Sequence, residues 1–311
     1  MGDPGPRAAM AGQRLGTLEA GRSPVVVSVV MAVRNASEHL AAQLRALAVQ
    51  ECPVGWELVV ADNGSVDASL DIVRDHQHLL PRVVVVDAAA ASGAGATRNA
   101  GVRAASGSLL VFCDADDEVA PGWLAGMVRG LAESDLVAAR VDFDRLNEPW
   151  TMTYRDAGGG LRDTRPAFLP YVFAAAMGVR RDVHEELGGF DETLTGAGED
   201  RDYCYRAQMA LGVRPAVVEE AVVHYRTRTS PLAVYRQSRS YALANVQLYR
   251  AYRACGLGRP PALRSLAGWL LVPVKGVWSL RSKRSFVLWM QTLGWRVGRL
   301  RGSLTYRIWA P

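Results

Sequence analysis

The sequence has little cysteine, and its four cysteines are scattered: Cys52, Cys113, Cys204 and Cys255, with no C-x-x-C pair. Closely spaced cysteine pairs are the signature of zinc sites and of small disulfide-bonded domains. Neither class fits this chain, and we expect four buried free thiols in a reducing compartment. With 311 residues and 49% hydrophobic composition, the chain instead has enough apolar material for one large core.

The chain also lacks long uninterrupted apolar runs. Residues 1–22 are rich in Gly, Ala, Pro and Arg and contain no apolar segment of the secretory-signal type, so we expect a disordered tail there. Farther along, Leu266–Val274 is apolar, but Pro273 breaks it and Lys275 follows it, which leaves it too short to span a bilayer. These features predict a cytoplasmic protein.

Acidic residues are missing from the end of the chain. Glu220 is the last of the 31 Asp and Glu residues, whereas residues 221–311 hold 16 of the 36 Lys and Arg residues. The remaining 20 basic residues leave residues 1–220 with a net charge of −11. An acidic body joined to a basic tail indicates two roles, because the body can bind cations and the tail can meet an anionic surface.

The body begins with the pattern of an α/β fold. Four short apolar runs rich in β-branched residues predict buried strands: Val25–Met31, Glu57–Ala61, Arg82–Asp87 and Ser108–Cys113. The segments between them have helical spacing, with Ser37 as the expected N-cap of the first helix and Gly95–Ala105 as the third helix. Strands that alternate with helices imply right-handed βαβ units and a mainly parallel sheet.

The rest of the body is less regular. We expect a helix after Pro121, then an apolar run over Leu136–Phe143 and a polar, Gly-rich mobile loop over residues 145–168. Glu199–Leu211 has helical spacing, and Pro215–Val223 predicts a last strand.

Polar residues stand where each of the first four strands ends: Asn35, Asp62, Asp87 and Asp114. In open α/β sheets, ligands bind in the crevice beyond the carboxyl ends of the strands. We therefore expect these four side chains to converge on one binding crevice.

Asp114-Ala115-Asp116-Asp117 follows the fourth strand directly. Three carboxylates so close together repel one another and have raised pKa values unless a cation shares them. A hard divalent cation, Mg or Mn, satisfies them when one or two carboxylates and diphosphate oxygens bind it. A solvated acidic turn that caps the next helix is the alternative; the position after a buried strand favours the cation.

The segment Gly93–Arg98 (GAGATR) contains two glycines of the dinucleotide-binding fingerprint. Arg98 occupies the place of the third glycine, and the segment follows the third strand rather than the first, so the fingerprint is not met. We expect instead a loop whose backbone approaches a diphosphate, with Arg98 as a charge partner.

Three further side chains have two interpretations each. Glu199 and Asp200 begin a helix, where the helix dipole stabilises acidic residues, but Asp200 is also a candidate general base. His224 follows the last strand and is either a core or surface residue or a third metal ligand.

Five stretches together resemble the family 2 glycosyltransferases of the GT-A fold. They span about two-thirds of the chain, from Val26 to Arg228, in the order typical of that family: VSVVMAVRN (Val27–Asn35), ELVVADNGSVDAS (Glu57–Ser69), GAGATRNAGVRAASGSLLVFCDADDEV (Gly93–Val119), VRRDVHEELGGFDE (Val179–Glu192) and GEDRDYCYRA (Gly198–Ala207). The resemblance implies a Rossmann-like, mixed but mainly parallel sheet flanked by helices.

The resemblance also implies a nucleotide-diphosphate-sugar donor and assigns residues to it. Ala32, Asp62 and Asn63 would lie around the base, and Arg98 near the diphosphate. Asn35 and Ala115 are expected in the same donor site.

For the reaction itself, the resemblance implies an inverting single displacement. Asp114 would contact the ribose or the metal, while Asp116 and His224 would ligate the divalent cation. Asp200 would be the base that deprotonates the acceptor hydroxyl, with Glu199 beside it.

Two departures from the family pattern bear on specificity. Many relatives have Pro-x-Tyr-Asn where this chain has Ala32-Val33-Arg34-Asn35, and the change removes an aromatic partner for the nucleotide base. The Q-x-x-R-W motif of processive polymer synthases is missing from the sequence, so we expect transfer of one or a few sugars rather than polymerisation. We expect the acceptor to be a carbohydrate or a lipid-linked molecule, in cell-surface polysaccharide, glycolipid or glycoconjugate synthesis. A sugar-phosphate nucleotidyltransferase and a non-catalytic GT-A-like binding protein are the alternatives.

We accordingly divide the chain into the tail (residues 1–22), a catalytic domain (23–228) and a basic, Trp-rich helical extension (229–311). The extension holds five of the eight tryptophans: Trp269, Trp278, Trp289, Trp295 and Trp309. Six basic residues interleave with them: Arg281, Lys283, Arg284, Arg296, Arg299 and Arg301. Such helices suit the anionic inner face of a membrane, near a lipid-linked acceptor. The alternative is packing on the core or on a second subunit, as a homodimer; nucleic acid is not expected.

Overall fold

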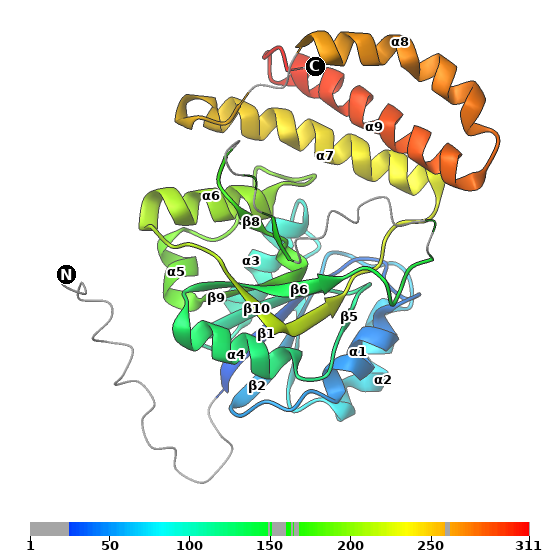
Figure 1. Cartoon of the computed structure of the whole chain (residues 1–311). Coiled ribbons are helices and arrows are strands. Elements are labelled where there is room, and N and C mark those ends of the chain that lie inside the picture. Colours follow the sequence, from blue (N-terminus) through cyan, green and yellow to red (C-terminus); the bar gives the residue numbers. More distant parts are fainter. Residues whose placement is uncertain are drawn as a thin grey trace.

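The computed structural model describes residues 25–148, 150, 160–162, 164, 168–258 and 262–310. The tail expected at residues 1–22 and much of the loop expected at 145–168 lie outside these residues. The described part of the chain forms a mixed α/β body with three long helices stacked on one side of it (Figure 1).

A mixed sheet is the centre of the body. Eight strands of the described residues form it, in the order β3-β2-β1-β4-β9-β6-β10-β5. Their bounds are β1 Val25–Val33, β2 Gly55–Asp62, β3 Val83–Asp87, β4 Leu109–Asp114, β5 Glu118–Val119, β6 Leu136–Asp142, β9 Met177–Arg180 and β10 Ala216–His224. β1 to β4 are parallel, as are β6 and β10, whereas β9 and β5 run antiparallel to their neighbours. The predicted mainly parallel, mixed sheet is confirmed. A second, two-stranded sheet pairs β7 (Leu161–Arg162) with β8 (Tyr171–Val172).

Helices cover both faces of the large sheet. Those of the body are α1 Leu40–Ala48, α2 Ser69–His76, α3 Ala94–Ala104, α4 Trp123–Glu133, α5 Arg181–Glu186 and α6 Glu199–Leu211. The expected N-cap at Ser37 is wrong, because α1 begins at Leu40. The Ser37 N–H instead donates to Asp67 Oδ2 (3.0 Å), so a side chain distant in the sequence holds this residue in the loop.

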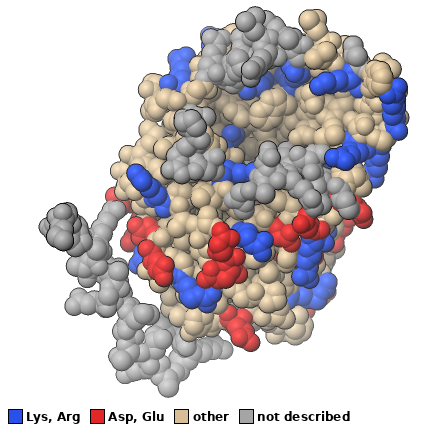
Figure 2. Space-filling model, in the orientation of Figure 1, with Lys and Arg blue, Asp and Glu red and all other residues tan. Residues whose placement is uncertain are grey.

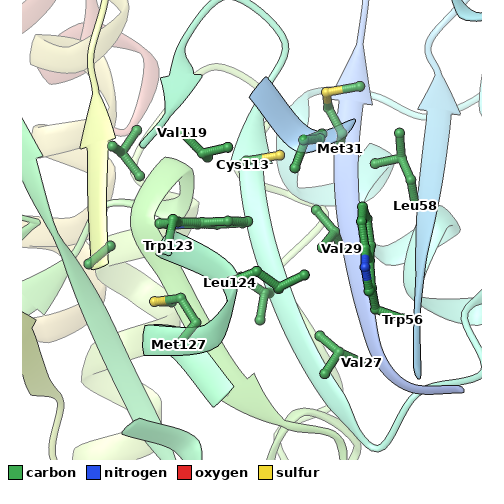
Figure 3. Close-up of a cluster of buried hydrophobic side chains, with 14 of the residues drawn as sticks. Val27, Val29, Met31, Trp56, Leu58, Cys113, Val119, Trp123, Leu124 and Met127 are labelled. Atoms are coloured by element: carbon green, nitrogen blue, oxygen red, sulfur yellow. The ribbon is translucent and has the colours of Figure 1, made fainter. Parts of the chain in front are cut away.

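Two apolar clusters fill the space between sheet and helices. Val27, Val29 and Met31 of β1 point to one face, where they join Trp123 and other side chains (Figure 3). Their neighbour Val30 points to the other face, toward a cluster under α3 and α6. Because β1 is covered on both faces, its apolar run is continuous rather than alternating. The four cysteines are free, as expected, and Cys113 and Cys204 are buried. The expected burial is wrong for Cys52, which is half-buried, and for Cys255, which is exposed.

The C-terminal helices are α7 Pro231–Tyr252, α8 Ala262–Ser279 and α9 Lys283–Thr305. Gly298 of α9 lies so close to α7 that a Cβ there would come 2.2 Å from the Arg239 carbonyl oxygen. α7 is attached to the body through α6, where the Tyr252 hydroxyl donates to Asp202 Oδ1 (2.6 Å) and Leu248 packs on Tyr205. α8 packs against α9 on the side away from the body (Figure 1). Among the helices of the described residues, none has the length and apolar character needed to cross a membrane.

Candidate functional site

Strand register brings the predicted residues of β1, β2 and β4 side by side. Ala32 of β1 is paired with Ala61 of β2 on one side and with Asp114 of β4 on the other. Asp62 is paired with Val33 and with Asp87 at the end of β3. The strand-end residues therefore lie at one edge of the sheet, as the parallel pattern predicts.

Asn63 and Asn35 hold the loops at this edge. The buried Asn63 side chain donates to the Ala88 and Ala91 carbonyl oxygens (3.0 and 2.7 Å), which fixes the chain after β3. Asn35 has a left-handed backbone (φ 49°), and its Oδ1 accepts from the Val66 N–H (2.9 Å), which joins the loops after β1 and β2. Both asparagines thus have structural roles, in addition to the contacts with the nucleotide-sugar donor that the sequence predicts for them.

Arg98 is the electrostatic centre of the site. Its side chain is 5% exposed and donates to Asp114 Oδ1 (2.7 Å) and to Glu199 Oε1 (2.9 Å). Burial opposes the guanidinium charge, but the two carboxylates outweigh it and raise the pKa of Arg98. Arg98 thus ties α3, the end of β4 and the start of α6 together, across 101 residues of sequence to Glu199.

The two glycines before Arg98 lack side chains, which lets the segment that leads into α6 pack closely against them. Gly93 has φ 92°, and a Cβ there would lie 2.4 Å from the Thr195 carbonyl oxygen. At Gly95 a Cβ would meet the Glu199 and Phe190 side chains, each at 3.2 Å. The close approach that these glycines permit is to Phe190, Thr195 and Glu199, while the diphosphate contact expected for this loop stays a prediction.

Asp116 and Asp117 are the other carboxylates of the acidic segment. Burial and then Asp114 raise the pKa of Asp116, although Arg228 lies 3.0 Å away. Asp117 is buried; burial and both neighbouring aspartates raise its pKa, and its Oδ2 has no hydrogen-bond partner among the described residues. The crowding predicted from sequence is present at these two residues, and a cation would relieve it.

Gln43 positions this segment and escaped the sequence prediction. Its Nε2 donates to the Asp114 carbonyl oxygen (3.1 Å) and its Oε1 accepts from the Val119 N–H (3.0 Å). The signal available in the sequence was an amide on the apolar face of α1, beside Leu40, Leu44 and Leu47.

His224 ends β10 and is bound to a carboxylate. Its Nδ1 lies 2.6 Å from Asp142 Oδ2, and its Nε2 lies 3.5 Å from Arg145 Nη1. Burial opposes the Asp142 charge, but hydrogen bonds from the Asp144 N–H and from His224 lower the pKa of Asp142. The described residues contain no group of three His, Cys, Asp or Glu side chains able to hold a metal ion. The three-ligand set Asp114, Asp116 and His224 therefore stays a prediction.

Asp200 lies in the first turn of α6, beside Glu199. Its Oδ1 accepts from the Arg201 N–H (2.7 Å). Burial, and then the Glu199 charge, raise the pKa of Asp200 to about 6. A carboxylate with this pKa is ionised near neutral pH and is still basic enough to accept a proton.

A cavity of about 590 Å³ opens beside Asp200. Its inner wall contains Arg98, Asp114 and Glu199, and its outer wall comes from the C-terminal helices, with Gln237, Ser240, Tyr241 and Asn245 on α7 and Arg284 and Trp295 on α9. A recess is visible in the upper half of Figure 2. No motif marks this outer wall, so sequence reasoning missed it.

Two family models match the chain. The one described as glycosyl transferase family 2 covers residues 28–188, more than half of the chain, and the one described as glycosyl transferase family group 2 covers residues 109–309. This chain belongs to glycosyl transferase family 2.

Curated relatives of this family 2 glycosyltransferase are distant. The chain is 28% identical to the glycosyltransferase AglE of Haloferax volcanii over 177 residues, which cover 56% of this chain and 58% of AglE. It is 29% identical to the pre-mycofactocin glycosyltransferase of Mycobacterium tuberculosis over 220 residues, 65% of this chain and 43% of that protein. The matches thus span about half of the length of these relatives.

Solved structures show the same fold in proteins of low identity. S. aureus TarS 1-349 superposes with a TM-score of 0.51 at 20% identity, over 92% of this chain and 93% of TarS 1-349. The mannosyltransferase PcManGT of Pyrobaculum calidifontis, solved with GDP-Man and Mn2+, superposes with a TM-score of 0.54 at 19% identity over 91% of each chain. These similarities establish that this family 2 glycosyltransferase has the GT-A fold.

Proposed function

We propose that this glycosyltransferase moves a sugar from a nucleotide-diphosphate-sugar to an acceptor hydroxyl, with inversion at the anomeric carbon. The observation that carries the proposal is the position of Asp200, a carboxylate with a raised pKa that lines the cavity together with Arg98, Asp114 and Glu199. In a single displacement, Asp200 takes the acceptor proton as the hydroxyl oxygen attacks, and the nucleoside diphosphate leaves from the opposite face.

The cavity is the proposed acceptor site. Its described lining includes Arg98 and Asp114 but not Asp62 or Asn63, the residues expected around the nucleotide base. The donor would therefore lie along the ends of β1 and β2, and the acceptor would enter on the side of Asp200. Amide, hydroxyl and aromatic side chains on α7 and α9 can hydrogen-bond and pack on a carbohydrate there.

Asp114 and Asp116 fit a divalent cation. Mg²⁺ and Mn²⁺ take carboxylate oxygens together with diphosphate oxygens and water, so two aspartates suffice. When bound, such a cation would stabilise the negative charge of the departing diphosphate. The solved mannosyltransferase with Mn2+ and GDP-Man has this fold, which supports the proposal. His224 is proposed as a further ligand, through its Nε2.

Replacing Asp116 by alanine is expected to lower kcat at least about 100-fold, because several kcal/mol of charge stabilisation are lost. Calorimetry should in parallel show that Mn²⁺ strengthens binding of UDP or GDP to the wild type and not to the variant. Asp75→Ala, at an exposed position of α2, is the matched control and should retain both properties. If Asp116→Ala keeps normal turnover and cation-dependent nucleotide binding, Asp116 does not hold the cation.

The pH dependence follows from the raised pKa of Asp200. The carboxylate must be ionised to accept the proton, so kcat/KM should fall about tenfold per pH unit below a midpoint near pH 6. An ordinary exposed aspartate would place this midpoint near pH 4. A profile of kcat/KM from pH 4 to 8 tests the prediction, and a flat profile between pH 5 and 7 contradicts it.

Two other functions lead to different products. A sugar-phosphate nucleotidyltransferase would release pyrophosphate, and a GT-A-like binding protein would release nothing. Under the proposed function, the enzyme works in the cytoplasm and its products enter cell-surface polysaccharides, glycolipids or glycoconjugates.

A further inference from the structure

α8 presents an apolar face that is exposed in the described part of the chain. Leu270, Leu271, Val277 and Trp278 recur at helical spacing along its outer side, and Leu280 continues the row into the turn before α9. Leu270, Val277 and Leu280 are 79%, 72% and 76% exposed. The opposite side of α8 faces α9, where Val272 is buried and its carbonyl oxygen accepts from Trp289 Nε1 (2.9 Å). These five outward residues are called the α8 patch below.

Basic side chains border the α8 patch, and no acidic residue lies near them in the sequence. Lys275, Arg281, Lys283 and Arg284 are exposed, and the Arg281 guanidinium lies over the Trp278 ring at 3.6 Å from its centroid. The sequence after Glu220 contains no acidic residue that could offset them. Exposed Leu and Trp side chains flanked by Lys and Arg match the headgroup and upper acyl region of an anionic bilayer.

Three other aromatic and basic residues of the extension have different roles. Trp295 lines the cavity and Trp289 packs between α8 and α9. Arg299 is buried and donates twice to the Ala310 carbonyl oxygen (2.9 and 2.7 Å). The surface that we consider for membrane docking is narrower than the sequence pattern implies: it is the α8 patch and its cationic border, whereas the exposed Trp309 and Arg301 lie outside it.

We propose that the α8 patch docks on a membrane surface containing anionic lipids, with α8 lying in the headgroup plane. A second copy of the chain is the competing occupant. Two facing α8 patches would bring their Lys and Arg borders together without acidic partners, whereas lipid phosphates neutralise that charge. Charge complementarity therefore favours the lipid surface.

Docking also has a consequence for the acceptor, which rests on the proposed function. Arg284, in the first turn of α9, lines the cavity, and it is four residues from Leu280 of the α8 patch. A docked α8 patch would place this side of the cavity near the lipid headgroups. That position suits an acceptor sugar carried on a lipid.

Vesicle sedimentation tests the docking without any need for turnover. Full-length protein should sediment with phosphatidylcholine vesicles that contain phosphatidylglycerol and stay in solution with phosphatidylcholine alone. Val277→Asp/Leu280→Asp should reduce the bound fraction roughly tenfold or more, and Lys275→Gln/Arg281→Gln should weaken binding about fivefold per charge removed. Leu304→Asp, on α9 and 73% exposed, is the matched control and should bind like the wild type.

The proposal is overturned if the wild type ignores anionic vesicles, or if Val277→Asp/Leu280→Asp binds them as well as Leu304→Asp does. If the wild type does not bind vesicles but forms a concentration-dependent dimer, and this double substitution dissociates the dimer, the α8 patch is instead the contact surface for a second copy of the chain. Turnover of a soluble acceptor should be the same in all three variants. Failure of the docking proposal would therefore appear in vesicle binding, and failure of the proposed function would appear in turnover.

Discussion

Asp200→Asn is expected to lower kcat by roughly 10²–10⁴-fold and to change the donor KM by no more than about twofold. Asparagine keeps the size of the side chain and can still accept the Arg201 N–H bond, but it cannot take a proton from the acceptor hydroxyl. The loss should therefore fall on the chemical step rather than on donor binding. Steady-state kinetics with a turned-over donor and acceptor measure both parameters.

Asp75→Asn serves as the control for Asp200→Asn, because Asp75 lies on the exposed side of α2. It should leave kcat unchanged. The Asp200 variant should also lose the fall in kcat/KM near pH 6, since no titrating base remains. A variant with near-normal kcat and the same acidic fall would remove Asp200 from the role of base.

Arg98→Met is expected to destabilise the fold by about 3–5 kcal/mol, because it leaves Asp114 and Glu199 without their shared cation. Met keeps the unbranched stem of Arg as far as the position of Nε, so the substitution removes mainly the guanidinium charge and its hydrogen bonds. Urea unfolding followed by circular dichroism measures the change. Adding Glu199→Gln should recover part of the loss, because one unpaired charge is removed, and the double-mutant cycle gives the coupling.

The control for Arg98 is Arg103→Met on the same helix, α3. Arg103 is 66% exposed and lies 3.5 Å from Glu192, and such surface pairs contribute about 0.2–1 kcal/mol. Equal destabilisation by the two substitutions would mean that Arg98 is not the centre of the charge cluster.

The half of the site at the strand ends could be predicted from sequence. β1 and β4 are continuous apolar runs, and their polar ends must meet at one edge once the strands are parallel. Ser37 shows where local reasoning fails. It satisfies the rules for an N-cap, yet Asp67 and Ser69, about 30 residues later, bind the Ser37 and Ala36 amides and hold this segment as a loop.

The other half of the site depends on contacts between distant segments. The cavity needs α7 against α6, and the Tyr252–Asp202 hydrogen bond that helps to hold it joins residues 50 apart in an otherwise ordinary helical pattern. Likewise, the sequence showed that Arg98 and Glu199 each belong to motifs, but not that they pair. In the extension, Trp and Arg residues looked equivalent by composition. The structure separates the buried Arg299 and the half-buried, hydrogen-bonded Trp289 from the exposed Trp278.

Product analysis is the sharpest test of inverting sugar transfer by this chain. The purified chain would be incubated with Mg²⁺ or Mn²⁺, a panel of nucleotide-sugars that includes UDP-GlcNAc and GDP-Man, and a panel of alkyl glycosides as acceptors. We expect release of a nucleoside diphosphate and formation of a glycoside whose new anomeric centre, read by proton NMR, has the configuration opposite to that of the donor. Retention of configuration, or release of pyrophosphate in place of a nucleoside diphosphate, would contradict it.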